Sequence, residues 1–291
     1  MYSIKNDYLS AKIKAIGAEL ISLKSKKGVE YIWGRDLRYW NGSAPILFPI
    51  VGNLRDKKAI INGKVYLMNI HGFLRDLHFE VLHQKEDEIS FVNTYSKETL
   101  AMYPFKYKVI ITYALKQNLL RTKYYIINEY EELLPFNIGG HPAFNCPIYP
   151  GESFNDYTIH FESEETFSSP RIERNGTLNF DIAACSYQNL KELQLDYSLF
   201  DIDTIIIPRV RSKKIGLLNK NNKGIYFYFP QFITFAIWSP PGKKAPFVCL
   251  EPWIGHGDRY NTDYDFMKKD NLIKLKTLEE FSVHYDIEIK E

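Results

Sequence analysis

The sequence contains few cysteines, and their arrangement argues against two classes of site. Only Cys146, Cys185 and Cys249 are present in 291 residues, and no two of them form a CxxC pair. An odd number of widely spaced cysteines argues against a disulfide framework and against a cysteine-based zinc site. Because this usage fits a reducing compartment, we expect a cytoplasmic protein.

The chain also lacks a surplus of one charge and any long hydrophobic run. Its 37 Lys and Arg residues nearly balance its 35 Asp and Glu residues, for a formal net charge of +2. The lysines are scattered among acids, so no basic stripe of the kind needed by a nucleic-acid-binding protein is present. No window approaches the length of a membrane-spanning segment. We therefore expect neither nucleic acid nor a membrane as a partner.

Several motifs of nucleotide, nucleophile and metal chemistry are missing. There is no GxGxxG or GxxxxGK[ST] loop, and no nucleophile elbow for a Ser–His–Asp triad. His71, His141, Glu251 and His256 could in principle form a zinc or iron site, but none shows HxH or HExxH ligand spacing. We expect no cofactor and no metal.

Aromatic and β-forming residues, by contrast, are abundant. Aromatic residues make up 15% of the chain, which favours sheets and flat apolar pocket walls. Short segments of alternating polar and apolar residues follow one another, and the triplet KQN at 116–118 predicts a hairpin turn. The few helical candidates are NLKELQL at 189–195 and a single turn in DYDFMKKD at 263–270.

This pattern predicts an all-β fold, a large antiparallel β-sandwich or barrel with few short helices. Strands at such frequent spacing, without helices between them, are typical of these architectures. No linker, low-complexity tract or short-period repeat divides the chain. We therefore expect residues 1–291 to form a single domain.

Four irregular segments interrupt the strands, and each combines Gly or Pro with a charged or imidazole side chain. Loops on a rigid scaffold are where binding and catalytic residues concentrate. The segments are RYWNGSAPILFPIVGNLRD (38–56), NIHGFLRD (69–76), NIGGHPAFNCPIYPG (137–151) and APFVCLEPWIGHGDRYN (245–261).

Two of these segments carry groups suited to acid–base chemistry. Glu251 ends an apolar run, where partial dehydration raises the pKa of a carboxyl toward the range of a general base. An isolated glutamate there is more often structural, but the neighbouring Trp253 offers a flat ring that could stack on a sugar. His141 lies between Gly140 and Pro142, which hold it in place and could let the loop approach a sugar ring closely.

Two Arg–Asp pairs recur in similar contexts, GNLRD and GFLRD. Such a pair is either a surface ion pair or a binding group, in which the aspartate orients the guanidinium so that it donates hydrogen bonds to sugar hydroxyls. We expect a binding role for Arg55 and a structural role for Arg75.

Taken together and in this order, four motifs resemble those of the aldose 1-epimerase (mutarotase) family, specifically its LacX-type branch. The motifs are APILFPIVGNLRD, HGFLRD, GGHPAFN and FVCLEPWIG, and the resemblance extends over nearly the full chain. It implies a galactose mutarotase-like β-sandwich with a carbohydrate cleft, and interconversion of the α and β anomers of a free sugar.

The resemblance also implies residue roles. Glu251 matches the family's general base and His141 its general acid, while Arg55 and His71 match a substrate-binding arginine and a second histidine. Asp203, in LFDIDTIII, is the nearest candidate for an aspartate that holds sugar hydroxyls. Glu251 would take the proton of the anomeric hydroxyl while His141 protonates the ring oxygen from the opposite side of the ring.

Other functions stay open at this point. The chain could bind or sense a sugar without turnover. It could instead act on phosphorylated hexoses, which would require basic residues at the cleft, with Arg35, Arg38, Arg75 and Arg259 as candidates. A glycosidase fits less well, because only one well-placed carboxylate is evident. A monomer and a homodimer are both compatible with the sequence.

Overall fold

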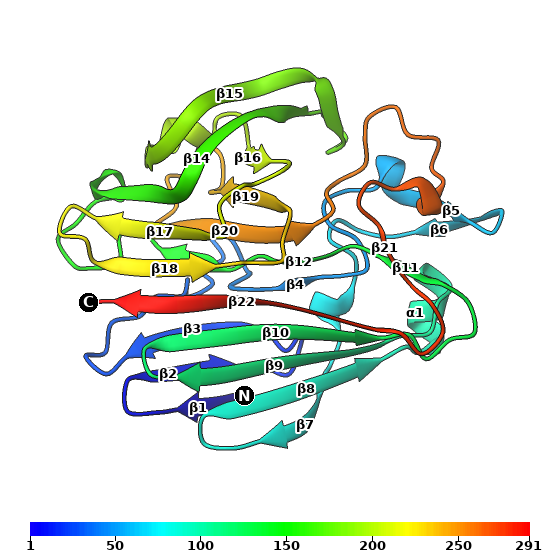
Figure 1. Ribbon diagram of the computed structural model, residues 1–291, viewed down its shortest axis with the longest axis horizontal. Coiled ribbons are helices and arrows are strands. Elements are labelled where there is room, and N and C mark those ends of the chain that lie inside the picture. Colours follow the sequence, from blue (N-terminus) through cyan, green and yellow to red (C-terminus); the bar gives the residue numbers. More distant parts are fainter.

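A computed structural model describes all residues 1–291, and antiparallel strands dominate it (Figure 1). The largest sheet has nine strands, which Figure 1 shows one above another from β15 at the top to β7 at the bottom. In spatial order they are β15 (Leu178–Gln194), β14 (Tyr157–Ile172), β17 (Lys214–Asn219), β18 (Gly224–Tyr228), β22 (Glu280–Lys290), β10 (Leu119–Ile127), β9 (Lys108–Lys116), β8 (Glu88–Thr94) and β7 (Glu80–Gln84).

Smaller sheets accompany the large one. A six-stranded sheet contains β16 (Thr204–Ile207), β19 (Thr234–Trp238), β20 (Phe247–Ile254), β12 (Ile138–Gly140) and β4 (Ile46–Leu47), with β13 (Ala143–Asn145) also paired to β20. A three-stranded sheet contains β1 (Tyr2–Lys5), β2 (Leu9–Ile13) and β3 (Leu20–Ser25). Two further pairs are β5 (Lys58–Ile61) with β6 (Lys64–Leu67), and β11 (Leu134–Phe136) with β21 (Ile273–Leu275).

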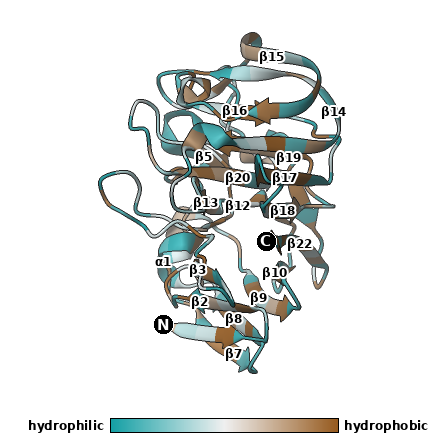
Figure 2. Ribbon diagram, turned by 90° about the vertical axis from the view of Figure 1, so that its left-hand side faces the viewer, coloured by the Kyte–Doolittle hydropathy of each residue, from teal (hydrophilic) through white to brown (hydrophobic).

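Aromatic contacts join these sheets into packed layers. Phe227 of β18 lies with its ring centre 5.8 Å from that of Phe144 in β13 and 6.3 Å from that of Phe235 in β19. In the other half, Tyr2 of β1 packs on Phe91 of β8 at 5.3 Å. Figure 2 shows β2 and β3 beside β8 and β9. The six- and three-stranded sheets thus pack against different halves of the nine-stranded sheet, and the core lies between them.

Helices are few and short. The one α-helix, α1 (Lys97–Met102), begins at a capping box formed by Ser96 and Thr99. The 3₁₀ turns are η1 (Arg55–Lys57), η2 (Leu74–Asp76), η3 (Phe154–Asp156), η4 (Tyr197–Phe200) and η5 (Phe266–Lys268). None of the helices has the length and apolar character needed to cross a membrane.

The predicted fold class is confirmed, and so are several elements. The KQN triplet turns between β9 and β10, and DYDFMKKD contains the single turn η5. The helix predicted for NLKELQL is wrong, since residues 189–194 belong to β15. Glu192 and Gln194 lie opposite His160 and Thr158 of β14. Cross-strand pairing therefore overrides the helix propensity of the Leu, Lys, Glu and Gln side chains.

Candidate active site

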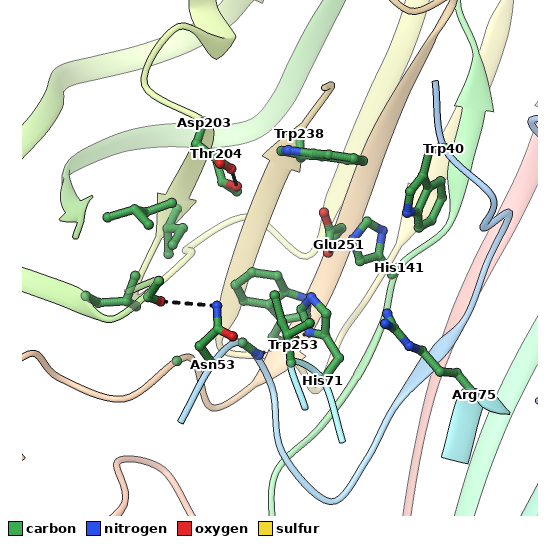
Figure 3. A pocket seen from close by; sticks show the side chains of 17 residues that line it. Trp40, Asn53, His71, Arg75, His141, Asp203, Thr204, Trp238, Glu251 and Trp253 are labelled. Carbon is green, nitrogen blue, oxygen red and sulfur yellow. Dashed lines mark hydrogen bonds and ion pairs between the residues drawn. The ribbon is translucent and has the colours of Figure 1, made fainter. Parts of the chain in front are cut away.

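A cavity of about 330 Å³ opens over the six-stranded sheet, and the irregular segments surround it (Figure 3). Its floor is formed by β20 and β19, and the segments around Asn53, His71 and His141 form part of its walls. The labelled lining residues are Trp40, Asn53, His71, Arg75, His141, Asp203, Thr204, Trp238, Glu251 and Trp253.

Strand β20 places two of the predicted residues side by side. Glu251 and Trp253 are two residues apart, so the period of a strand points both side chains to the same face. Both are buried, and Glu251 lies opposite Ala236 of the neighbouring strand β19. The small alanine leaves open space above the sheet beside the carboxyl group.

The two glycines before His141 serve packing against aromatic rings. A Cβ on Gly139 would lie 2.6 Å from Cδ1 of Trp253, and one on Gly140 would lie 2.7 Å from Cε1 of Tyr285. Only glycine lets β12 approach both rings at this distance. Their role is therefore to seat the strand that precedes His141, rather than to bring the loop close to a sugar as we expected.

The central feature of the cavity is a close contact between His141 and Glu251. Nε2 of His141 lies 3.2 Å from Oε2 of Glu251, and both side chains are almost completely buried. Neither Nδ1 of His141 nor Oε2 of Glu251 has a hydrogen-bond partner. The two groups lie next to each other and not on opposite sides of a ring-sized space, which corrects the arrangement we expected.

Burial shifts the pKa of both groups toward their neutral forms. Removal from water raises the pKa of Glu251 well above its ordinary value, and the negative charge of Asp203 adds to the rise, while Trp253 partly offsets it. Removal from water, together with the positive charge of Arg75, lowers the pKa of His141 to about 3. The free site therefore favours a neutral carboxyl beside a neutral imidazole.

His71 is held as a hydrogen-bond donor toward the cavity. Its Nδ1 accepts the backbone N–H of Gly52 at 3.1 Å, and burial lowers its pKa well below the usual range. A neutral imidazole whose Nδ1 accepts carries its hydrogen on Nε2. The backbone of His71 has a φ of 66°, a strained value for a non-glycine residue.

Two tryptophans that the motifs did not reveal enclose His141. The ring of Trp40 stacks on His141 at 4.8 Å with an interplanar angle of 26°, and Trp238 meets it edge-on at 5.7 Å. Gly42 makes room for this arrangement, because a Cβ there would lie 2.3 Å from the Trp40 ring. The sequence signals were the Trp–Asn–Gly triplet at 40–42 and a tryptophan at the end of an apolar strand.

The positions of the two arginines are the reverse of those we expected. Arg55 does not line the cavity, because its Nη1 donates to the carbonyl of Thr262 at 2.7 Å and its guanidinium packs on the ring of Tyr264. Arg75 does line it, and its nearest acidic partner is Asp76 at 3.9 Å. In GNLRD it is instead Asn53 that lines the cavity.

The remaining predicted residues fall into two groups. Asp203 lies at the cavity, where its Oδ1 accepts the hydroxyl of Thr204 at 2.7 Å, and its carboxylate stays exposed. His256 lines a separate hollow, with Nδ1 2.7 Å from the carbonyl of Gly257. Of the four residues considered as metal ligands from the sequence, His71, His141 and Glu251 line the cavity and His256 does not. The donor atoms of His141, Glu251 and Cys249 do lie within 4.8 Å of one another.

Comparisons with known proteins agree on one family. A sequence profile of the aldose 1-epimerase family matches residues 1–262. The chromosomal and plasmid forms of protein LacX from Lactococcus lactis subsp. lactis are each 36% identical over 294 residues, with 98% of both chains covered.

Solved structures show the same similarity. The galactose mutarotase related enzyme from Lactobacillus acidophilus has a TM-score of 0.93 at 29% identity, over 100% of this chain and 97% of that one. A galactose mutarotase-like protein from Lactobacillus casei has a TM-score of 0.92 at 31% identity, over 99% of each chain. The fold is thus galactose mutarotase-like, and the chain belongs to the aldose 1-epimerase family.

Proposed function

We propose that this protein is an aldose 1-epimerase that interconverts the α and β anomers of an aldohexose by acid–base ring opening. The observation that carries the proposal is the buried contact of 3.2 Å between Nε2 of His141 and Oε2 of Glu251, in a cavity of about 330 Å³ walled by aromatic rings. Family membership supports the same reaction class.

The neighbouring positions of the two groups suit the geometry of a hemiacetal. The anomeric hydroxyl and the ring oxygen are bonded to the same carbon, so a base and an acid that lie side by side can each reach one of them. Glu251 takes the proton of the hydroxyl and His141 protonates the ring oxygen. The open aldehyde rotates about C1–C2, and the reverse transfers close the ring on the other face.

The reaction needs a carboxylate and an imidazolium, whereas burial favours the neutral pair. The neutral pair and the ionic pair contain the same number of protons and differ only in which side chain, Glu251 or His141, holds one of them. Moving that proton from Glu251 to His141 across 3.2 Å gives the reactive state without exchange with solvent. A bound sugar stabilises this state by donating its anomeric hydroxyl to the carboxylate and accepting from the imidazolium.

Other residues would hold the sugar in place. His71 donates a hydrogen bond from Nε2, and the exposed carboxylate of Asp203 accepts from sugar hydroxyls. The rings of Trp253 and Trp238 provide apolar walls for the C–H face of a pyranose. These groups orient the anomeric carbon against Glu251 and His141.

Polarimetry on freshly dissolved α-glucose and α-galactose tests the proposal. We expect the purified protein to accelerate the decay to the equilibrium rotation in proportion to its concentration. Calorimetric binding of either sugar without any acceleration would contradict the proposal and would identify a sugar-binding protein instead.

A further inference from the structure

A second hollow of about 230 Å³ adjoins the candidate active cavity. Trp40 and Arg75 line both spaces, so these two side chains form the boundary between them. The hollow is otherwise lined mainly by charged and polar residues, namely Lys14, Glu19, Arg35, Asn41 and Asp76, together with Ile16, Gly42 and Pro45. A substituent of a bound sugar that passed Trp40 would enter this hollow.

Two guanidinium groups line the second hollow, and neither donates a hydrogen bond to a carboxylate. Arg35 donates only to the carbonyl oxygen and Oδ1 of Asn41, at 3.0 and 3.1 Å. Arg75 makes no hydrogen bond, and the Asp76 carboxylate 3.9 Å away is 75% exposed. Two guanidinium groups that line one hollow repel each other, and an anion bound there offsets that repulsion.

The remaining charged groups of the hollow neutralise one another. Lys14 forms a salt bridge with Glu19, and Oε1 of Glu19 also accepts the backbone N–H groups of Ser43 and Ala44. Glu19 is therefore fully occupied in holding the loop that carries Trp40. Its negative charge is balanced by Lys14 and does not neutralise the positive charge of Arg35 or Arg75.

The order of groups along the cavity decides which sugar substituent faces this hollow. Figure 3 shows Asp203 and Arg75 at opposite ends, with Glu251 and His141 between them and His141 nearer to Arg75. With the anomeric hydroxyl at Glu251 and the ring oxygen at His141, the next carbon on the Arg75 side is C5. Its substituent, C6, then points to Trp40 and Arg75.

We propose that the substrate is an aldohexose with an anionic group at C6, a phosphate or a carboxylate, which binds between Arg35 and Arg75. This inference rests on the proposed function for the position of the sugar ring. Of the four arginines that the sequence offered for such a group, these two line the same hollow. Arg38 is paired with Asp36 at the surface, and Arg259 is paired with Asp270 in another hollow.

An anion in this position also helps the reaction itself. The positive charge of Arg75 lowers the pKa of His141, which opposes the imidazolium that protonates the ring oxygen. A phosphate or carboxylate against Arg75 offsets that charge, so His141 holds a proton more readily when the anionic sugar is bound. The proper substrate would thus activate the acid that acts on it.

Anomer exchange measured by NMR saturation transfer tests the inference with glucose, glucose 6-phosphate and glucuronate. We expect kcat/KM for at least one anionic sugar to exceed that for glucose about tenfold or more, as one charge-assisted contact provides. The Arg35→Gln variant should lower this ratio about tenfold, mainly through KM. Arg38→Gln is the matched control and should leave the ratio unchanged.

The possible outcomes separate this inference from the proposed function. A preference for the 6-phosphate alone identifies phosphate as the anion, and a preference for glucuronate alone identifies carboxylate. Equal kcat/KM for all three sugars, or a ratio that Arg35→Gln does not change, overturns the inference while mutarotation stands. If no sugar is turned over, the proposed function fails, and calorimetry then decides: glucose 6-phosphate or glucuronate must bind more tightly than glucose and lose that advantage in Arg35→Gln, or the inference fails too.

Discussion

Glu251 is a buried carboxyl, and its Oε2 has no hydrogen-bond partner. Its pKa is raised in the folded protein, so the folded carboxyl retains a proton that the unfolded chain releases near 4.5. The stabilisation linked to this proton is complete below pH 4.5 and is lost as the pH rises toward the folded pKa.

The first prediction follows from this linkage and concerns Glu251→Gln. The variant cannot ionise, so its free energy of unfolding relative to wild type should increase as the pH rises above 4.5, by about 1.4 kcal/mol for each unit of the shift. Urea denaturation at a series of pH values from 4 to 8 measures the difference. A variant that becomes less stable than wild type at neutral pH would show that the folded pair is ionic.

Arg55 and Arg75 show where prediction from sequence stops at the level of single residues. Both follow leucine in an LRD triplet and lie in a 3₁₀ turn, Arg55 as the first residue of η1 and Arg75 as the second residue of η2, so their local patterns are nearly the same. The difference between them comes from residues far away in the sequence: Arg55 contacts Thr262 and Tyr264, which hold it away from the cavity. Glu251 and His141 are singled out by their own sequence contexts, the apolar run that Glu251 ends and the glycine and proline that flank His141, and both line the cavity.

At the level of elements, the seating of β12 against β20 depends on Gly139. The second prediction is that Gly139→Ala lowers the free energy of unfolding by about 1–3 kcal/mol through overpacking against Trp253. It should also raise KM, since Trp253 lines the cavity. Thermal melts and mutarotation kinetics measure the two effects. Gly34→Ala is the control, because nothing lies within 4 Å of the Cβ it adds; equal effects of both variants would refute the packing role.

The strands were predictable because alternation is a local property of the sequence. In β9, every second residue from Val109 to Leu115 is buried and the residues between them are partly buried, which agrees with the sequence alternation that predicted the strand. The segment at 189–194 was mistaken for a helix because its partner, β14, lies some thirty residues away and leaves no mark on local propensity. Trp40 was missed because its function depends on stacking against His141, a residue about a hundred positions further along.

At the level of the whole molecule, one buried ion pair joins distant loops around the cavity. Nζ of Lys269 donates to Oδ1 of Asp258 at 2.8 Å and to the carbonyl of His256 at 2.7 Å. Oδ2 of Asp258 accepts the backbone N–H of Arg55 at 3.0 Å. The pair thereby fixes the segment after β20 against the loop at Asn53 and Arg55.

The third prediction is that Lys269→Met lowers the free energy of unfolding by about 3–5 kcal/mol, because it leaves the Asp258 carboxylate buried without its partner. The side chains of Lys269 and Asp258 are only 3% and 9% exposed. Lys268→Met is the matched control: its pair with Asp263 is exposed and should contribute less than about 1 kcal/mol. Urea denaturation of both variants measures the difference, and similar losses would contradict the structural role of the buried pair.

The central claim is that Glu251 and His141 together move the protons of anomer exchange. Its most direct test is the kcat of mutarotation for wild type, Glu251→Gln and His141→Asn, with the exposed Glu80→Gln as control. We expect each of the two cavity variants to reduce kcat by about 10²–10⁴, the usual contribution of a general acid or base, while Glu80→Gln stays at the wild-type rate. A Glu251→Gln variant with the full wild-type rate would contradict the account.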